Sequence, residues 1–380
     1  MTSFRFAVRA LAVSLVLTAV GALCVVAPVA PASAATRNPV GGRQLAARGV
    51  IVNLEPGVPA PPAMPAASFV IADMDTGQIL AAKAPHARHL PASTLKTLTA
   101  LTLIPRFDVN AKIMVKPEDA RVDGTRLGII PGTAYNATSL LQGLMMVSGN
   151  DTAWALARGN KSVAVTLRAM NANAAYLHAT DTVAKNPSGL DAPGQTSSAY
   201  DLALIGRAAM KLPDFRKYVI TKQATLPVGR SADGKRRPGF KIATHNKLLL
   251  NYPGTIGIKS GYTIAAKNTF IGAATRGGKT YIVTQMASTN GSWRPTAALL
   301  DWAFKNGADI TPIGELVNPG SQTVAPPPPT VGPAVRPEPA VNTSGLQPQS
   351  TLPLWVALVS VLGLLALVRS RLRRRTSRRR

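Results

Sequence analysis

The sequence is short of cysteine, of aromatic residues and of acidic residues. A single cysteine, Cys24, stands among 380 residues, so a disulfide-stapled fold is excluded. Hydrophobic residues make up 46% of the chain, which excludes a wholly disordered protein. Lysine and arginine outnumber acidic residues by 43 to 17, but eight arginines lie within residues 369–380. Because aromatics amount to only 5% and do not alternate with basic residues, we expect no nucleic-acid partner.

The first 35 residues have the composition of a secretory signal peptide. Arg5 and Arg9 supply a positive start, residues 10–30 form an apolar run, and Ala32-Ser33-Ala34 supplies small residues for cleavage. Cys24 lies inside this run, so the mature chain is expected to lack cysteine, as suits a bacterial envelope protein that relies on its core. Residues 36–65 are interpreted as a lead-in with little periodicity.

The C-terminal part of the sequence predicts a membrane anchor. Residues 312–351 are rich in proline, which favours an extended linker. Residues 352–368 are apolar except for Ser360 and, as a helix, would rise roughly 25 Å, the lower limit for crossing a bilayer. The arginine-rich tail at 369–380 predicts that this flank is cytoplasmic. We therefore expect a single-pass protein of the cell membrane, with its main domain outside the cytoplasm.

Residues 66–311 remain as one domain of the α/β class, in the α+β arrangement. Residues 68–81 have the alternation and the Asp-Thr-Gly turn of a β-hairpin, and strand-like runs return at 255–260, 269–275 and 280–287. The residues between have helical spacing, most clearly at 93–104, 139–147, 151–158, 163–176 and 199–210, and a last helix is expected at 295–304. This order predicts an antiparallel sheet of about five strands, completed by both ends of the domain and flanked by helices.

A serine and a lysine three residues apart form the first candidate for chemistry. On a helix, Lys96 shares a face with Ser93 and can reach its hydroxyl. A serine hydroxyl is a weak nucleophile until a neighbouring base, such as a neutral lysine, takes its proton. Such pairs also arise by chance in a chain of this length, so this pair alone does not define a site.

Two further motifs strengthen the interpretation. Ser148 and Asn150 stand in the short break between two predicted helices, where a hydroxyl and an amide could face the nucleophile, although Ser-Gly-Asn is also a common helix stop and start. Lys259, Ser260 and Gly261 end a strand-like run, and a cation, a hydroxyl and a closely approaching backbone suit a carboxylate.

In this order and context, the three motifs match the set found in penicillin-binding proteins and class A β-lactamases. Residues 66–305 resemble the serine D-alanyl-D-alanine carboxypeptidases, the low-molecular-mass penicillin-binding proteins. The resemblance extends to Asn186-Pro187-Ser188-Gly189-Leu190-Asp191, Tyr252-Pro253-Gly254 and the residues from Gly257 to Thr263. One departure is Ser260, which stands where threonine is usual and keeps the hydroxyl.

The resemblance implies a role for each matching residue. Ser93 would attack the carbonyl between two D-alanines, Lys96 would be its general base, and Ser148 and Asn150 would form the opposite wall. The terminal carboxylate would be bound by Lys259, Ser260 and, in the position of a family arginine, Arg294. The backbone N–H groups of Ser93 and Tyr262 would form the oxyanion hole beside Gly261. The implied partners are peptidoglycan stem peptides ending in D-Ala-D-Ala, with β-lactams as inhibitors and no cofactor.

Two alternative functions and two weaker signals complete the interpretation. A β-lactamase would need an additional glutamate for fast deacylation, and residues 148–259 contain none. A non-catalytic scaffold could use its basic surface to bind the cell wall. Asp75-Thr76-Gly77 lacks the second such carboxylate motif that an aspartic protease requires, so it is interpreted as a turn. His86 and His89 are too few to predict a metal site.

Overall fold

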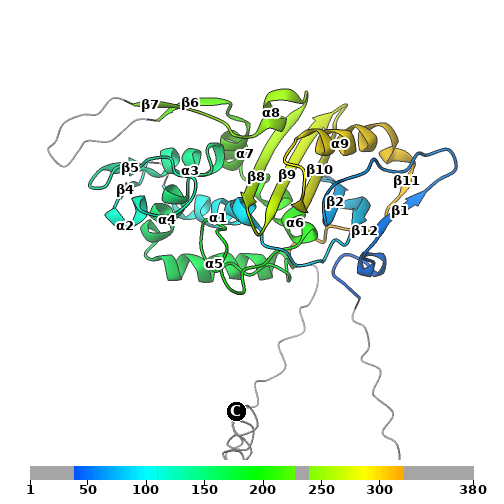
Figure 1. Ribbon diagram of the computed structural model, residues 1–380, viewed down its shortest axis with the longest axis horizontal. Helices are drawn as coiled ribbons and strands as arrows, with labels where there is room; N and C mark the ends of the chain where they lie inside the picture. Colours follow the sequence, from blue (N-terminus) through cyan, green and yellow to red (C-terminus); the bar gives the residue numbers. More distant parts are fainter. Residues whose placement is uncertain (1–37, 109, 227–238, 321–380) are drawn as a thin grey trace, which may run out of the picture. The chain divides into compact units, whose positions relative to one another are not determined.

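The computed structural model describes residues 38–108, 110–226 and 239–320. Within these ranges, eight strands form one antiparallel sheet in the order β11-β1-β3-β2-β10-β9-β8, with β12 beside β3 (Figure 1). The strands are β1 (Val50–Leu54), β2 (Ser68–Asp73), β3 (Gln78–Lys83), β8 (Thr255–Thr263), β9 (Lys267–Arg276), β10 (Lys279–Ser288), β11 (Ile310–Thr311) and β12 (Gly314–Glu315). The predicted antiparallel sheet is thereby confirmed.

Helices cover both faces of this sheet (Figure 1). One hydrophobic cluster joins alternate strand residues, such as Val70 and Ile282, to the helices of the central part of the chain. The other joins the intervening residues, such as Ile71 and Val283, to α9 and α8. The α-helices are α1 (Lys96–Leu103), α2 (Pro117–Ala120), α3 (Ala137–Met146), α4 (Asn150–Gly159), α5 (Val163–Tyr176), α6 (Ala199–Ala209), α7 (Pro213–Ile220), α8 (Lys247–Asn251) and α9 (Arg294–Asn306).

Short local elements complete the described chain. Two small two-stranded sheets lie apart from the main sheet, β4–β5 (Lys112–Met114 and Ala134–Asn136) and β6–β7 (Gln223–Leu226 and Phe240–Ala243). The predicted hairpin at 68–81 is confirmed as β2–β3. Its turn is fixed because Asp73 Oδ1 accepts the N–H groups of Asp75 and Thr76, and Gly77 has a φ of 87°.

The sheet is wider than the prediction of about five strands. β1 lies in the predicted lead-in and pairs with β3, while Asn53 and Thr311 are register partners in β1 and β11. β12, which falls in the predicted linker, pairs with β3. The folded domain therefore extends beyond 66–311 at both ends. β1, β11 and β12 are two to five residues long, and β11 and β12 pair with strands more than two hundred residues earlier, so no local pattern predicts them.

The predicted signal peptide, transmembrane helix and arginine-rich tail lie outside the described residues, as does most of the linker. Among the residues that the structure describes, no helix has the length and apolar character needed to cross a membrane.

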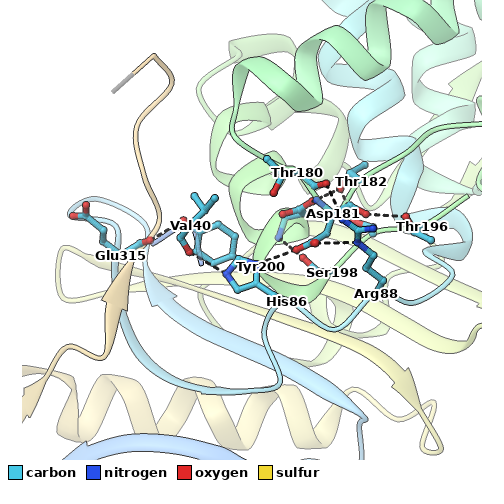
Figure 2. A network of polar contacts seen from close by, with 12 residues as sticks. Val40, His86, Arg88, Thr180, Asp181, Thr182, Thr196, Ser198, Tyr200 and Glu315 are labelled. Carbon is cyan, nitrogen blue, oxygen red and sulfur yellow. Dashed lines mark hydrogen bonds and ion pairs between the residues drawn. The ribbon is translucent and has the colours of Figure 1, made fainter. Parts of the chain in front are cut away.

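A polar network around His86 and Tyr200 joins the two ends of the described chain (Figure 2). The His86 ring lies between Val40 O, 3.0 Å from Nε2, and Asp181 Oδ2, 2.9 Å from Nδ1. It also contacts the Tyr200 ring, at 4.6 Å between centroids. The Tyr200 hydroxyl donates to Glu315 O at 2.9 Å. The N-terminal segment and β12 are thus bound to the same helix, α6.

Asp201, which lies beneath this network, gives the fold a pH-dependent stability. It is fully buried, and burial together with the nearby Asp181 raises its pKa from 3.8 to about 7. Its Oδ2 accepts from Thr182 Oγ1, whereas Oδ1 has no partner among the described residues. Since the folded state holds this proton more tightly than the unfolded state, the contribution of Asp201 to stability falls as the pH rises from about 4 through 7.

Asp201→Asn is expected to remove this dependence. The amide oxygen can accept from Thr182 as the carboxylate does, but it does not ionise. The free energy of unfolding of the variant relative to wild type should therefore rise between pH 4 and pH 8, by up to about 4 kcal/mol at 1.36 kcal/mol per pKa unit. Urea unfolding at both pH values measures this, with the exposed Asp309→Asn as the control. A difference that does not change with pH would contradict the prediction.

Candidate active site

Ser93 lies in a short 3-10 helix, η2 (Ala92–Leu95), that leads directly into α1. The predicted helix at 93–104 is therefore present, but its first turn is tighter than an α-helix. Ala92 has a φ of 47°, and Thr94 Oγ1 and Thr269 Oγ1 both donate to Pro91 O, at 2.6 and 2.8 Å. In a 3-10 turn residues three apart are eclipsed, so Ser93 and Lys96 project in the same direction.

The Lys96 side chain is completely buried beneath Ser93. Its Nζ lies 2.8 Å from Ser93 Oγ, 2.6 Å from Asn150 Oδ1 and 2.6 Å from Ser188 O. The amide oxygen and the backbone carbonyl can only accept hydrogen bonds. A neutral amine has two N–H groups, which these two acceptors occupy, so its lone pair is left facing the Ser93 hydroxyl. The three contacts therefore orient an uncharged Lys96 to take the Ser93 proton.

The surroundings of Lys96 favour this uncharged form. Burial holds the pKa of Lys96 well below its usual value, and the nearby Lys259 lowers it further, while Asp151 opposes both. In the structure, the loss of hydration is the larger cause.

Ser148 and Asn150 occupy the junction between α3 and α4, as predicted. Ser148 has a φ of 64°, a left-handed conformation that turns the chain between the two helices. A Cβ on Gly149 would lie 2.8 Å from the Asp151 carboxylate, so only glycine fits there. Asn150 is held from both ends of its amide, because Nδ2 donates to Asp123 O at 2.6 Å while Oδ1 accepts from Lys96.

Two groups that position these residues were missed by the sequence interpretation. Ser188 contributes its backbone carbonyl to Lys96, and a carbonyl leaves no signature in the sequence. The neighbouring Gly189 could have indicated it: φ is 83°, and a Cβ there would lie 1.9 Å from Ala92 O. Asp151 is buried and accepts the backbone N–H groups of residues 127–129, which fixes the loop that faces Asn150.

Lys259, Ser260 and Gly261 lie on β8, the last strand of the sheet among the described residues. Lys259 is 2% exposed, its Nζ donates to Ser260 O at 2.7 Å, and burial lowers its pKa to about 7. A Cβ on Gly261 would lie 2.7 Å from Ser93 N, so the missing side chain is what allows β8 to approach the nucleophile.

A cavity of about 330 Å³ brings most of the predicted residues together. Ser93, Ser148, Ser260, Gly261 and Tyr262 line it. Lys96 and Asn150 lie directly below through their hydrogen bonds, and Lys259 is close enough to affect the pKa of Lys96.

Arg294, the remaining predicted site residue, does not line this cavity either. It is exposed at the start of α9, and its guanidinium carbon lies 5.4 Å from the centroid of the Trp293 ring. Trp293 itself lines the cavity, so Arg294 is one residue removed from it. Its role in carboxylate binding stays a prediction.

One group of possible metal ligands occurs among the described residues: His86, Asp181 and Asp201, whose ligand atoms lie within 4.8 Å of one another. No sequence motif indicates this group, because the two carboxylates are some hundred residues from the histidine. Both ring nitrogens of His86 already lie within hydrogen-bond distance of oxygen atoms, and Arg88 Nε donates to Asp181 at 3.1 Å. None of the three residues lines the cavity beside Ser93. The group is an ion-pair network of the fold.

Comparison with known proteins agrees with this geometry. The sequence profile of the Peptidase S11 family, D-alanyl-D-alanine carboxypeptidase, matches residues 56–290. The D-alanyl-D-alanine carboxypeptidase DacB2 of Mycobacterium tuberculosis is 41% identical over 247 residues, which are 63% of this chain and 82% of the relative.

Solved structures of proteins from two bacteria have the same fold. The crystal structure of a D-alanyl-D-alanine carboxypeptidase from M. tuberculosis H37Rv superposes with a TM-score of 0.65 at 38% identity, over 70% of this chain and 99% of the other. The DD-transpeptidase of Streptomyces K15 gives a TM-score of 0.63 at 29% identity, over 65% of this chain and the whole of the other. Ser93 beside the buried Lys96 agrees with the family match over residues 56–290, and the chain belongs to the Peptidase S11 family of serine D-alanyl-D-alanine carboxypeptidases.

Proposed function

We propose that this protein removes the terminal D-alanine from peptidoglycan stem peptides through an acyl-enzyme on Ser93. The observation that carries the proposal is the triple contact of Lys96 Nζ with Ser93, Asn150 and Ser188. That arrangement suits a neutral amine acting as a general base on the serine hydroxyl.

The first half of the reaction forms the acyl-enzyme. Ser93 Oγ attacks the carbonyl carbon of the peptide bond between the two D-alanines, and its proton passes to Lys96. The backbone N–H groups of Ser93 and Tyr262 stabilise the negative charge that develops on the carbonyl oxygen. The bond to the leaving nitrogen then breaks, and that nitrogen receives a proton relayed from Lys96 through Ser148. D-Alanine leaves with a free amine.

Recognition of the substrate rests on its terminal carboxylate. Ser260 on the cavity wall and the buried Lys259 would bind this group, and Arg294 would approach from the start of α9. A carboxylate beside Lys259 favours its protonated form, which counteracts the lowering of its pKa by burial. Substrate binding would therefore promote the positive charge on Lys259, and this charge lowers the pKa of Lys96.

The second half of the reaction hydrolyses the ester. Water attacks the acyl carbonyl, with Lys96 as base, and Ser93 recovers its proton. A β-lactam would acylate Ser93 in the same way but leave slowly, so the protein would bind penicillin. A β-lactamase remains the alternative, although residues 148–259 contain no glutamate to speed deacylation. In the cell, the enzyme would remodel the wall from the membrane surface, held by residues 352–368.

A pentapeptide that ends in D-Ala-D-Ala tests the proposal. We expect residues 36–320 to release one D-alanine per peptide, detected by mass spectrometry as the tetrapeptide. Glycine added as an acceptor distinguishes a transpeptidase, the activity named for the Streptomyces protein, because it would replace the terminal D-alanine in the product. Penicillin labelling without any release of D-alanine would favour the wall-binding scaffold instead.

A further inference from the structure

The cavity beside Ser93 continues past Ser260 into a recess on the face of the sheet that packs against α8 and α9. Ser260, Phe270 and Gln285 are register partners on β8, β9 and β10, so their side chains form one row across three adjacent strands. Phe270 and Gln285 line the same cavity as Ser93. At the strand spacing of about 4.8 Å, the row extends roughly 10 Å from the edge strand. α8 and α9 lie at this face of the sheet (Figure 1).

Gln285 lies at the inner end of the recess, and the oxygen of its buried amide is unpaired among the described residues. Gln285 is 3% exposed, and no described residue lies within hydrogen-bond distance of its Oε1. Buried polar groups are nearly always hydrogen-bonded, so an exception calls for a group that is absent from the protein itself. Because the residue lines the cavity, that group can enter from the catalytic side.

The residues that line the recess favour a bound side chain that is uncharged or acidic. Lys247 and His245 line it beside α8, and Ser292 and Trp293 line it before α9. No aspartate or glutamate is among the described residues that line the cavity. Burial and the nearby Lys259 lower the pKa of His245, so the imidazole favours its neutral form. A cationic side chain would find no countercharge here.

We propose that this recess is a leaving-group subsite, in which Gln285 recognises a polar side chain of the C-terminal residue. The inference rests on the proposed function, because it takes the terminal carboxylate to be bound at Ser260. A leaving D-alanine has only a methyl group to place beyond that carboxylate and would leave the Gln285 amide unpaired. A D-amino acid with a longer side chain that ends in an amide, such as D-glutamine, can reach the amide and exchange hydrogen bonds with it. The enzyme then trims stem peptides that end in polar D-residues as well as in D-alanine.

Hydrolysis of three peptides tests this subsite. They share a penultimate D-alanine and end in D-alanine, D-glutamine or D-norleucine, where norleucine has a similar length but no polar end. The measured quantity is kcat/KM for release of the terminal residue. In the wild type we expect D-glutamine to be preferred over D-norleucine by about tenfold, the worth of one satisfied amide pair. In Gln285→Leu this preference should disappear or reverse.

Two further variants keep the result interpretable. Gln285→Met conserves the length of the side chain and should give the same loss of preference if Gln285→Leu folds poorly, as thermal unfolding will tell. Gln78→Leu makes the same change at an exposed position on β3 and should keep the wild-type ratio. An unaltered ratio in the Gln285 variants, or a wild type that cleaves only D-alanine, would show that the recess holds nothing but water. Failure to release even D-alanine would instead refute the proposed function.

Discussion

Ser93→Ala should abolish both penicillin labelling and the release of D-alanine, lowering the rate of each by about 10⁴-fold or more. The reason is that the acyl-enzyme needs an oxygen at this position, and no other hydroxyl shares the environment of Ser93. Ser148 and Ser260 line the same cavity, but Ser93 has the only described hydroxyl that is recorded within hydrogen-bond distance of Lys96 Nζ. Fluorescent penicillin and gel electrophoresis measure the adduct, and a D-alanine assay measures the turnover.

The serine prediction has a matched control. Ser162→Ala makes the same chemical change at the N-terminus of α5, where the hydroxyl accepts from Val165 N, and should lower stability by about 1 kcal/mol without changing labelling. Comparable thermal unfolding of Ser93→Ala and wild type would show that the domain is intact. Labelling that survives in Ser93→Ala would assign the nucleophile to another residue.

Lys96→Arg should lower acylation by about 10³-fold to 10⁴-fold, although it supplies the positive charge that a protonated lysine would carry. A guanidinium does not lose its proton in proteins and so has no lone pair to offer Ser93. An electrostatic role for Lys96 would survive this substitution, whereas a role as a base would not. Stopped-flow measurement of penicillin acylation gives the rate. In the wild type, the rate should rise with pH around a midpoint well below 10.5, because burial and Lys259 favour the neutral amine.

Because Lys96 is completely buried, a larger guanidinium could disturb the site for steric reasons. Lys96→Met, which is no larger than lysine, separates the two effects and should lose acylation to the same extent. Lys305→Arg makes the same lysine-to-arginine substitution at an exposed position on α9. This control variant should be acylated at the wild-type rate. Retention of substantial acylation by either Lys96 variant would transfer the general-base role to another group, such as Ser148.

Local spacing explains why much of the site could be predicted. Ser93 and Lys96 are separated by one turn, so their contact follows from the helix alone. The junction at Ser148 and the glycine at 261 were marked by residue types that suit tight turns and close backbone approach. The β2–β3 hairpin was recognised from alternation and an Asp-Thr-Gly turn for the same reason.

The contacts that the sequence did not reveal are made by backbone atoms or over long separations. Ser188 contributes a carbonyl to Lys96 from 92 residues away. Asp151 binds the N–H groups of a loop with no regular secondary structure, so nothing in that loop predicts the interaction. The unpaired amide of Gln285 sits in an ordinary alternating strand, and only the register of β8, β9 and β10 reveals that it faces the cavity.

The position of β10 in the sheet has a consequence for biogenesis. β10 pairs with β2 on one side and β9 on the other, and Tyr281 is the register partner of Asp73. The first hairpin therefore has no neighbour at the centre of the sheet until the ribosome has added some two hundred further residues. Contacts of such separation are slow to form. The main sheet should therefore close only late in synthesis, after β9 and β10 have left the ribosome.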